Sequence, residues 1–382
     1  MHYMDHNATT PLDPNVWEAM LPYYQYYYAN ASSRHRLGMQ QRDAVESARE
    51  RIANVLRVEP VQIIFTSGGT EANNLFLYGA SYGRMAKSIW VGAYEHPSIM
   101  EPAKTLARKE WQFKVIPGQQ DGTLDLDAWQ IDKTLMKDSI VSAMLVNNET
   151  GVIFDIKKLA ERLENSGTCL HTDATQAIGK IPVDFEALGV DALTLSAHKC
   201  YGPKGIGALV VSKRLDIAPQ IIGGGHERGR RSGTEPVPLI VGFAEAVERA
   251  EMQREAWVHH VKPLRDKLEH ELKSLGAMVF AENTERVANT TYFGFDGIHG
   301  DSWVIFLDEG EFAVSSGSAC STHKSVNASS VLQAMGYQRE RAETAVRISL
   351  GWATTVDAVE ALLVLIKQGL TKFSKMPAMY LV

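Results

Sequence analysis

An alternation of short apolar stretches with longer amphipathic ones, over about residues 14–254, constrains the fold more than any other feature. The apolar stretches have the length of buried strands and lie at residues 61–66, 88–92, 140–146, 168–171 and 192–195. Between them lie helical patterns such as residues 155–165, where Ile156, Leu159 and Leu163 share one face. Because strands separated by helices need crossover connections, we expect an α/β fold with a mainly parallel sheet covered on both sides.

The pattern changes after about residue 238. A long helical segment over residues 238–275 is followed by a mixed pattern, with an expected strand, helix and strand at residues 290–295, 301–307 and 345–350. The chain has 382 residues, more than one hydrophobic core usually supports. We therefore expect a large domain of residues 13–255 and a smaller α+β domain formed by residues 1–12 and 256–382.

The composition favours small-molecule chemistry. A net charge of −6 gives no electrostatic reason to expect nucleic acid or an anionic membrane as a partner. Residues 1–5 show no basic segment leading into an apolar core, and no apolar run approaches the roughly 20 residues that span a bilayer, so we expect a cytoplasmic protein. The cysteines Cys169, Cys200 and Cys320 lack CxxC spacing, which argues against a disulfide framework or a metal site.

The segment Ser196-Ala197-His198-Lys199 holds the most informative lysine. A lysine among serine, histidine and glycines is placed to be held, partly desolvated and used as an amine nucleophile. Upstream, Asp173 closes another apolar stretch with a carboxylate. Either residue alone is more simply a surface lysine or a turn aspartate. Together they suggest pyridoxal phosphate, because that cofactor needs a Schiff-base lysine and an acid beside its ring nitrogen.

Further candidate residues follow other expected strands. Ser67-Gly68-Gly69-Thr70 leads into a helix start, where glycines and the helix terminus favour an anion, so Gly69 and Thr70 are candidates for a phosphate cup. The alternative interpretation is an ordinary helix start, with Glu71 only a capping residue matched to the helix dipole. His96 is placed to stack on a pyridine ring, although a lone histidine is more often a satisfied loop residue. We expect these groups to meet Asn148 beyond the carboxyl ends of the strands.

Three further sequence features can each be interpreted in two ways. The glycine- and arginine-rich residues 223–235 form either a solvated flexible loop or an anion-binding loop that carries Thr234 toward a partner subunit. Cys320 lies among small polar residues, which favours an exposed reactive thiol over a buried packing residue. Arg347 lies in a β-like run and needs a carboxylate partner, either structural or on the substrate, and we favour the substrate.

In these motifs the chain resembles the NifS/IscS-type cysteine desulfurases, which are class V aminotransferases of fold type I. The resemblance runs almost from end to end, and eight motifs in order make it specific. Those motifs include Asp5-His6-Asn7-Ala8-Thr9-Thr10, Ser67-Gly68-Gly69-Thr70-Glu71, Glu95-His96-Pro97, Asn147-Asn148-Glu149, Asp173-Ala174-Thr175-Gln176, Ser196-Ala197-His198-Lys199, Arg230-Arg231-Ser232-Gly233-Thr234 and Ser315-Ser316-Gly317-Ser318-Ala319-Cys320.

The resemblance implies pyridoxal 5′-phosphate as cofactor and a seven-stranded, mainly parallel sheet in the large domain. Lys199 would be the Schiff-base lysine, Asp173 the partner of the ring nitrogen, and Gln176 a donor to the ring hydroxyl. His96 would stack on the ring and act as an acid or base. The phosphate would be held by Thr70, Ser196 and His198, with Thr234 reaching in from the second subunit of a homodimer.

The implied reaction converts L-cysteine to L-alanine. Asn148 and Arg347 would grip the substrate carboxylate, and Cys320 would take the sulfur as a persulfide. An acceptor protein then receives the sulfur for iron–sulfur assembly, thiolation of tRNA or DNA, or cofactor synthesis.

Two alternatives are kept. A selenocysteine lyase or a class V aminotransferase would use the same cofactor, but a transaminase has no use for Cys320. A non-catalytic scaffold is disfavoured because Lys199, Asp173, His96 and Cys320 are all present.

Overall fold

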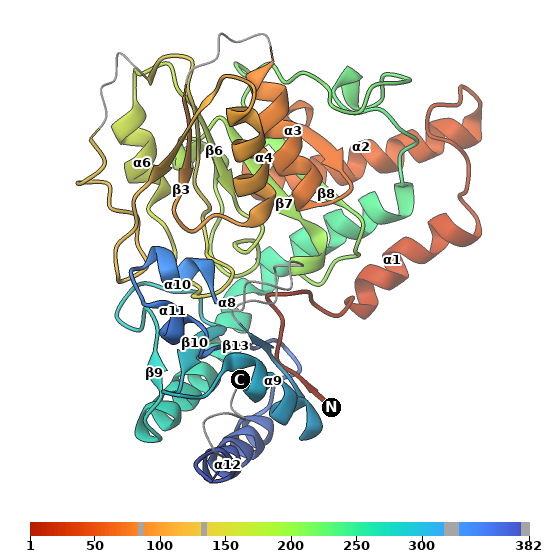
Figure 1. The fold of residues 1–382 in the computed structure, drawn as a ribbon. Coiled ribbons are helices and arrows are strands. Elements are labelled where there is room, and N and C mark those ends of the chain that lie inside the picture. Colours follow the sequence, from red (N-terminus) through yellow and green to blue (C-terminus); the bar gives the residue numbers. More distant parts are fainter. Residues whose placement is uncertain (83–87, 131–135, 317–327, 376–382) are drawn as a thin grey trace.

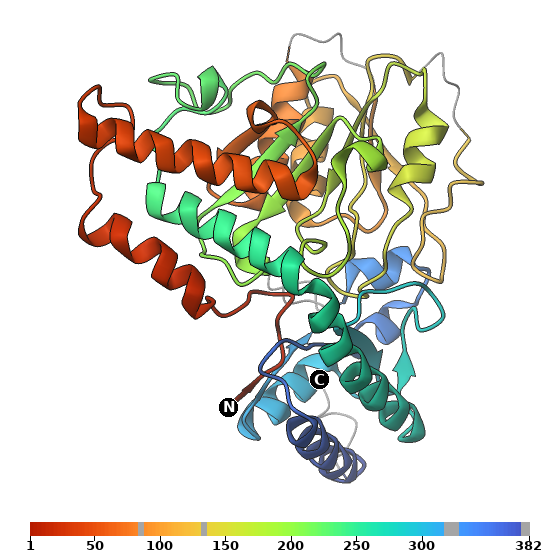
Figure 2. The ribbon, with the colours of Figure 1, turned by 180° about the vertical axis from the view of Figure 1, so that it is seen from behind.

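The computed structural model describes residues 1–82, 88–130, 136–316 and 328–375. Two bodies of unequal size share the long helix α8 (Val237–Ser274), which leaves the larger body and continues along the smaller one (Figure 2). The expected helix over residues 238–275 is thus confirmed within one residue at each end. Within the described residues, no helix is both long and apolar enough to cross a bilayer.

The larger body is built on a seven-stranded sheet (Figure 1). β8 runs antiparallel to both of its neighbours, and the other neighbouring pairs are parallel, so the expected α/β fold with a mainly parallel sheet is confirmed. The spatial order is β2 (Ile63–Thr66), β8 (Gly207–Val211), β7 (Ala192–Ser196), β6 (Cys169–Asp173), β5 (Ile140–Ser142), β3 (Ser88–Gly92) and β4 (Gln112–Ile116).

Alternate residues of each strand enter two separate cores, one on each face of the sheet. Ile63 and Phe65 join the core that contains α2 (Arg36–Leu56) and the first half of α8, whereas Ile64 joins the core under α3 (Gly69–Ser81) and α4 (Pro97–Ala107). α1 (Pro14–Gln25) packs on α8 and contributes Val16 and Met20 to the first core (Figure 2). Both faces are therefore covered, and this explains why the strands read as apolar runs.

One helix agrees with the sequence prediction, whereas one strand is shorter than predicted. Helix α6 (Ile156–Leu163) buries Ile156, Leu159 and Leu163 as predicted, and the side chain of Asp155 caps it by accepting from the Lys158 N–H at 2.9 Å. β5 ends at Ser142, earlier than the expected residue 146. Its parallel pairing with β3 stops there, and the chain continues as a buried loop toward the strand ends.

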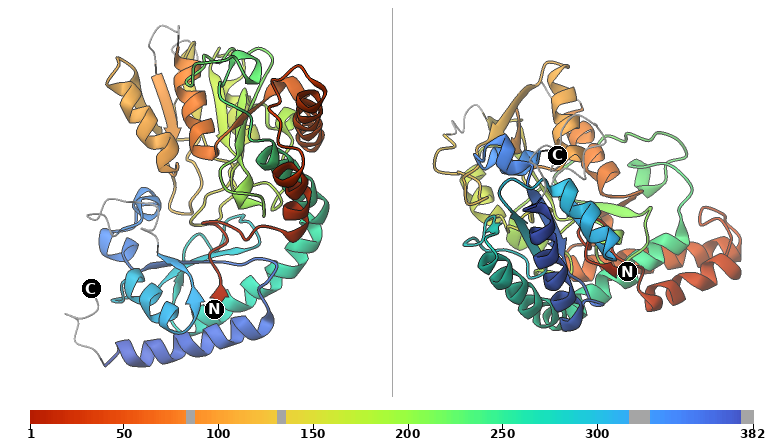
Figure 3. Two further views of the ribbon diagram at one scale, coloured as in Figure 1. Left: turned by 90° about the vertical axis from the view of Figure 1, so that its right-hand side faces the viewer. Right: turned by 60° about the horizontal axis from the view of Figure 1, so that its bottom comes forward.

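The smaller body has an antiparallel sheet and a core of its own (Figure 3). Met4 contributes to this core, and β1 (His2–Tyr3) pairs with β11 (Phe312–Ala313). The sheet order is β12 (Ser315–Ser316), β13 (Ala345–Ser349), β10 (Thr290–Gly294) and β9 (Met278–Val279), flanked by α9 (Gly300–Glu309) and α12 (Val356–Phe373). The domain division at residues 13 and 255 remains a prediction, since α8 continues through residue 255.

Residues 223–235 are anchored rather than freely solvated. Glu227 is buried and forms a two-point ion pair with Arg49, at 2.8 Å for each N–O contact, and it also accepts from the Phe65 N–H at 2.9 Å. Arg231 pairs with Glu71 at 2.8 Å. The arginines described here bond to the protein itself, so the loop is held against α2 and β2.

The Arg49–Glu227 pair gives a stability prediction. Glu227→Gln should lower the free energy of unfolding by about 3 kcal/mol, because it leaves the Arg49 guanidinium as an uncompensated buried charge. Urea denaturation measures this change. Glu46→Gln is the matched control, because Glu46 also contacts Arg49 but its side chain is 41% exposed, and it should cost less than about 1 kcal/mol. Equal losses in both variants would contradict the assignment.

Candidate active site

A cavity of about 320 Å³ lies at the carboxyl ends of the parallel strands, where the two bodies meet. Asn7 and Arg347 close it from the side of the smaller body. Ten of the twelve residues predicted from sequence line this one cavity, namely Gly69, Thr70, His96, Asn148, Asp173, Gln176, Ser196, His198, Lys199 and Arg347. The strand ends therefore gather the candidate groups, as the parallel sheet predicts.

The remaining two predicted residues are not in this set. Cys320 lies outside the described residues. Thr234 is exposed and borders a separate hollow with Ser67 and Glu235, so it does not face the cavity of its own chain. Its expected action on a second subunit remains a prediction.

The start of α3 forms one end of the cavity. A side chain in place of the hydrogen of Gly69 would stand 3.1 Å from the Thr175 hydroxyl and 3.5 Å from the Ser196 side chain, so glycine allows this close approach. The Thr175 hydroxyl is buried and has no hydrogen-bond partner among the described residues. A helix N-terminus beside a buried hydroxyl without a partner is suited to a bound anion.

Glu71 does not contribute to the cavity. Its carboxylate accepts from the Ser67 N–H at 2.7 Å and pairs with Arg231 at 2.8 Å. Glu71 therefore caps the start of α3, and Gly69 and Thr70 remain the candidates for a phosphate cup. The same contact ties the phosphate-cup candidate to the loop that carries Thr234.

Asp173 is held with its carboxylate at the cavity wall. Its Oδ2 accepts from the Asn73 side-chain amide at 2.8 Å, and its Oδ1 accepts from the Thr175 N–H at 2.9 Å. Asn73 also donates to the Ser98 hydroxyl at 2.9 Å. Asn73 was missed by the sequence analysis, although its place one turn after the glycines of α3 was an available signal.

His96 caps α4 with its ring. Its Nδ1 accepts from the Ser98 N–H at 3.1 Å. Burial lowers the pKa of His96, Asp173 opposes this shift, and the Lys199 ammonium adds to it. The lowered pKa favours a neutral imidazole at pH 7, which suits a flat group that packs on a ring.

Lys199 reaches the N-terminal segment across the cavity. Its Nζ donates to the backbone carbonyls of Asn7 at 2.6 Å and Ala8 at 2.7 Å. The Gln176 side chain donates to the same Asn7 carbonyl at 2.8 Å. The lysine predicted as nucleophile is thus held among polar groups from two distant parts of the chain.

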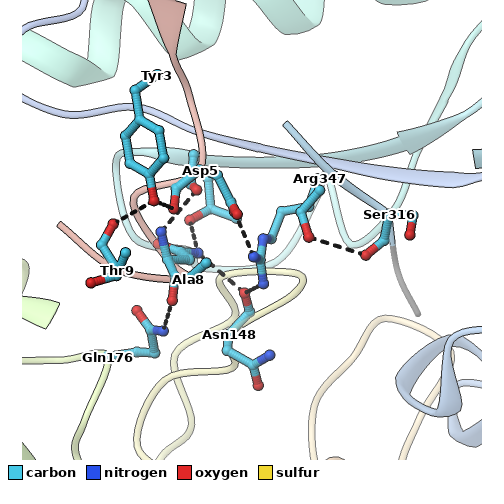
Figure 4. Close-up of polar contacts among 12 residues, drawn as sticks. Tyr3, Asp5, Ala8, Thr9, Asn148, Gln176, Ser316 and Arg347 are labelled. Atoms are coloured by element: carbon cyan, nitrogen blue, oxygen red, sulfur yellow. Dashed lines mark hydrogen bonds and ion pairs between the residues drawn. The ribbon is translucent and has the colours of Figure 1, made fainter. Parts of the chain in front are cut away.

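Arg347 has a structural carboxylate partner. Its Nη2 pairs with Asp5 at 2.7 Å, and its Nη1 donates to the Asn148 carbonyl at 2.8 Å (Figure 4). We favoured the substrate as partner, and the structure shows that Asp5 already balances the buried charge. Arg347 also lines the cavity, so its contact with substrate remains a prediction.

The two described cysteines are packing residues. Cys169 and Cys200 are both buried. Burial raises the pKa of Cys200 to about 12, so its thiol stays protonated although it follows Lys199 directly.

Comparisons with known proteins identify the family and the fold. The family model described as "Aminotransferase class-V" matches residues 2–362. The chain is 39% identical to the cysteine desulfurase IscS of Edwardsiella ictaluri over 387 aligned positions, covering 99% of this chain and 95% of that protein. A solved "NIFS-like protein" superposes with a TM-score of 0.90 at 36% identity, covering 97% of this chain and 99% of that one. The structure of "SspA in complex with cysteine" gives 0.79 at 30% identity, with 92% and 99% covered.

The protonation of His198 can be tested directly. Its Nδ1 lies 3.1 Å from the Thr9 hydroxyl, and burial, together with the charges of Lys199 and Lys204, lowers its pKa to about 4. Its side-chain nitrogen resonances should therefore titrate near pH 4, with the assignment made by their loss in His198→Gln. Because the folded pKa lies below the unfolded value of about 6.5, this residue lowers stability as the pH falls between these values. A midpoint near 6.5 would contradict the assignment.

Proposed function

The chain belongs to the class-V aminotransferase family and is a cysteine desulfurase, and from this premise we propose that pyridoxal 5′-phosphate occupies the cavity and that Cys320 accepts the sulfur of L-cysteine. One observation carries the proposal. Lys199 and Asp173, an amine and a carboxylate, border a single cavity that also contains the N-terminus of α3. That combination matches the amine, ring-nitrogen partner and phosphate site that the cofactor needs.

The residues present fit this cofactor in size and chemistry. A volume of about 320 Å³ lies within the range of small-molecule sites. The buried Thr175 hydroxyl without a partner lies at the end where a phosphate would bind. The Asp173 carboxylate, fixed by Asn73 and the Thr175 N–H, is suited to hold a proton-bearing ring nitrogen.

In this proposal each cavity residue has a distinct task in holding the cofactor. Lys199 would bind it covalently, Asp173 would hold the ring nitrogen, and His96 would pack on the ring. Gln176 would donate to the ring hydroxyl. Gly69, Thr70, Ser196 and His198 would hold the phosphate, with Thr234 supplied by the second subunit of a homodimer.

When bound, this cofactor supplies a protonated ring that withdraws electrons from the α-carbon of the substrate. The protein orients the substrate through Arg347 and Asn148, which face the cavity together. Once the substrate amine had displaced Lys199 from the cofactor, the freed Lys199 amine would take the α-proton and hold it as an ammonium group. The neutral His96 lies at the same cavity and adds no further positive charge to it.

Residues at both ends of the segment that contains Cys320 support its role. On one side, Ser315 pairs with Arg347 in the sheet register. On the other side, the Ser329 hydroxyl donates at 2.5 Å to Glu149, and Glu149 directly follows Asn148 in the sequence. Residues 317–327 are therefore flanked on one side by a residue paired with Arg347 and on the other by a residue bonded to the neighbour of Asn148. Both Arg347 and Asn148 line the cavity.

The sulfur transfer is a substitution at the sulfur of bound L-cysteine. The Cys320 thiolate forms the new S–S bond, and the bond from that sulfur to the substrate β-carbon breaks with its electron pair left on carbon. Protonation of that carbon, return of the α-proton from Lys199 and release of the amine from the cofactor would give L-alanine. The persulfide would pass its outer sulfur to an acceptor protein. A cytoplasmic location remains a prediction from the sequence.

Loss of Cys320 tests the sulfur step. Cys320→Ser should nearly abolish alanine release from L-cysteine in the presence of a thiol reductant, while the absorbance of the bound cofactor stays unchanged, because Cys320 is the sulfur acceptor and not a cofactor ligand. Cys169→Ala is the matched control and should retain activity, since Cys169 is buried at the far end of β6. Equal alanine release from wild type and Cys320→Ser would favour a lyase or a transaminase.

A further inference from the structure

Lys180 is a buried lysine to which the proposed function gives no task. It lies one turn after Gln176, and only 6% of the residue is exposed. Its Nζ donates to the Gln176 Oε1 at 2.6 Å and to the Asn7 Oδ1 at 2.9 Å. None of the ion pairs found among the described residues includes Lys180. Burying an ammonium group with only amide partners costs free energy, because no opposite charge compensates for the lost hydration.

The hydrogen bonds of Lys180 fix the orientation of the Gln176 amide. An amide side chain has one oxygen and one NH₂ group, and it can turn either of them toward a neighbour. Because Lys180 is a donor, it selects the oxygen of Gln176. The NH₂ group is thereby turned to the Asn7 carbonyl, which is the acceptor that also receives the Lys199 Nζ at 2.6 Å.

Lys180 helps to fix the Asn7 side chain in the same way, together with the Asn289 amide, which donates to the same Oδ1 at 3.2 Å. The Asn7 Oδ1 accepts from Lys180, so the Asn7 NH₂ group donates to the Thr290 hydroxyl at 2.9 Å and to the Asn148 carbonyl at 3.2 Å. That carbonyl is also the acceptor of Arg347. One ammonium group therefore orients two amides that connect Lys199 with the proposed substrate site.

The charge of Lys180 acts on the same neighbours. Burial and, after it, the charges of Lys199 and Arg347 lower the pKa of Lys180 to about 7, while Cys200 acts in the opposite direction. Repulsion between two ammonium groups is mutual, so a charged Lys180 also disfavours a proton on Lys199. The charge of Lys180 also acts on His6. The pKa of His6 is lowered to about 4, mainly by burial and to a smaller extent by Lys180.

We propose that Lys180 is a positioning residue of the active site, which orients Gln176 and Asn7 around Lys199 and, through its charge, favours the unprotonated amine of Lys199. This inference rests on the proposed function, in which Lys199 is the amine that binds the cofactor. Lys180 itself touches neither substrate nor cofactor in this assignment.

Two substitutions in the full-length holoenzyme separate the contributions of charge and hydrogen bonding. Lys180→Met removes both, whereas Lys180→Gln removes the charge and retains a donor amide. Each variant is characterised by the pH midpoint of the visible absorbance of the bound cofactor, which reports protonation at the Lys199 nitrogen, and by kcat and KM for alanine release. Lys213→Met is the control, because Lys213 is exposed on the surface.

Both variants should raise the pH midpoint by about one unit, because a neighbouring positive charge is lost. Lys180→Met should also lower kcat about tenfold, which corresponds to about 1.4 kcal/mol, and Lys180→Gln should restore part of this loss. Lys213→Met should match wild type. If both midpoints stay at the wild-type value and only the thermal stability falls, Lys180 is a packing residue and the proposal is wrong.

The outcome also separates this inference from the function on which it rests. A wild-type protein whose absorbance shows no bound cofactor would refute the proposed function itself. Wild-type absorbance with unchanged midpoints in the variants would refute only the role of Lys180. If Lys180→Met does not fold, the midpoint of Lys180→Gln alone decides the question of charge.

Discussion

The active site depends on the N-terminal segment that runs between the two bodies. The Asn7 carbonyl receives Lys199 and Gln176 from the larger body, while the Asn7 N–H donates to the Ser349 hydroxyl of the smaller body at 2.9 Å. Asp5 adds the ion pair to Arg347. Buried polar networks of this kind fix one arrangement only when every member has a partner. The relative placement of the cavity walls thus follows from a few residues at the start of the chain.

Much of the fold could be predicted because the sheet is buried on both faces. Strands such as β6 and β7 are buried at every position and place apolar residues on both faces of the sheet, so the sequence indicates them directly. β4 has a different character, since it lies at the sheet edge and its residues are partly exposed. Lys114 interrupts its apolar pattern, and the strand was not among those expected. The early end of β5 was also missed, because the loop beyond it is equally buried and apolar.

The site residues also fall into those that the sequence predicts and those that it does not. Asp173 and Lys199 follow strands, and the carboxyl ends of parallel strands meet at one edge, so sequence position predicted their convergence. Asn73 and Lys180 act through partners 100 and 173 positions away, which no local pattern reveals. The sequence also favours the substrate over Asp5 as the partner of Arg347, because Asp5 lies 342 positions away and no local pattern connects the two residues.

The central claim is that Lys199, held at the meeting point of the strand ends, is the amine that binds the cofactor. Borohydride reduction of the holoenzyme, followed by proteolysis and peptide mass spectrometry, tests it most directly, because reduction makes a lysine–cofactor bond permanent. The cofactor mass should be found on the peptide that contains Lys199 and not on the one that contains the nearby Lys180. Recovery of the mass on Lys180, or on no lysine at all, would contradict this account.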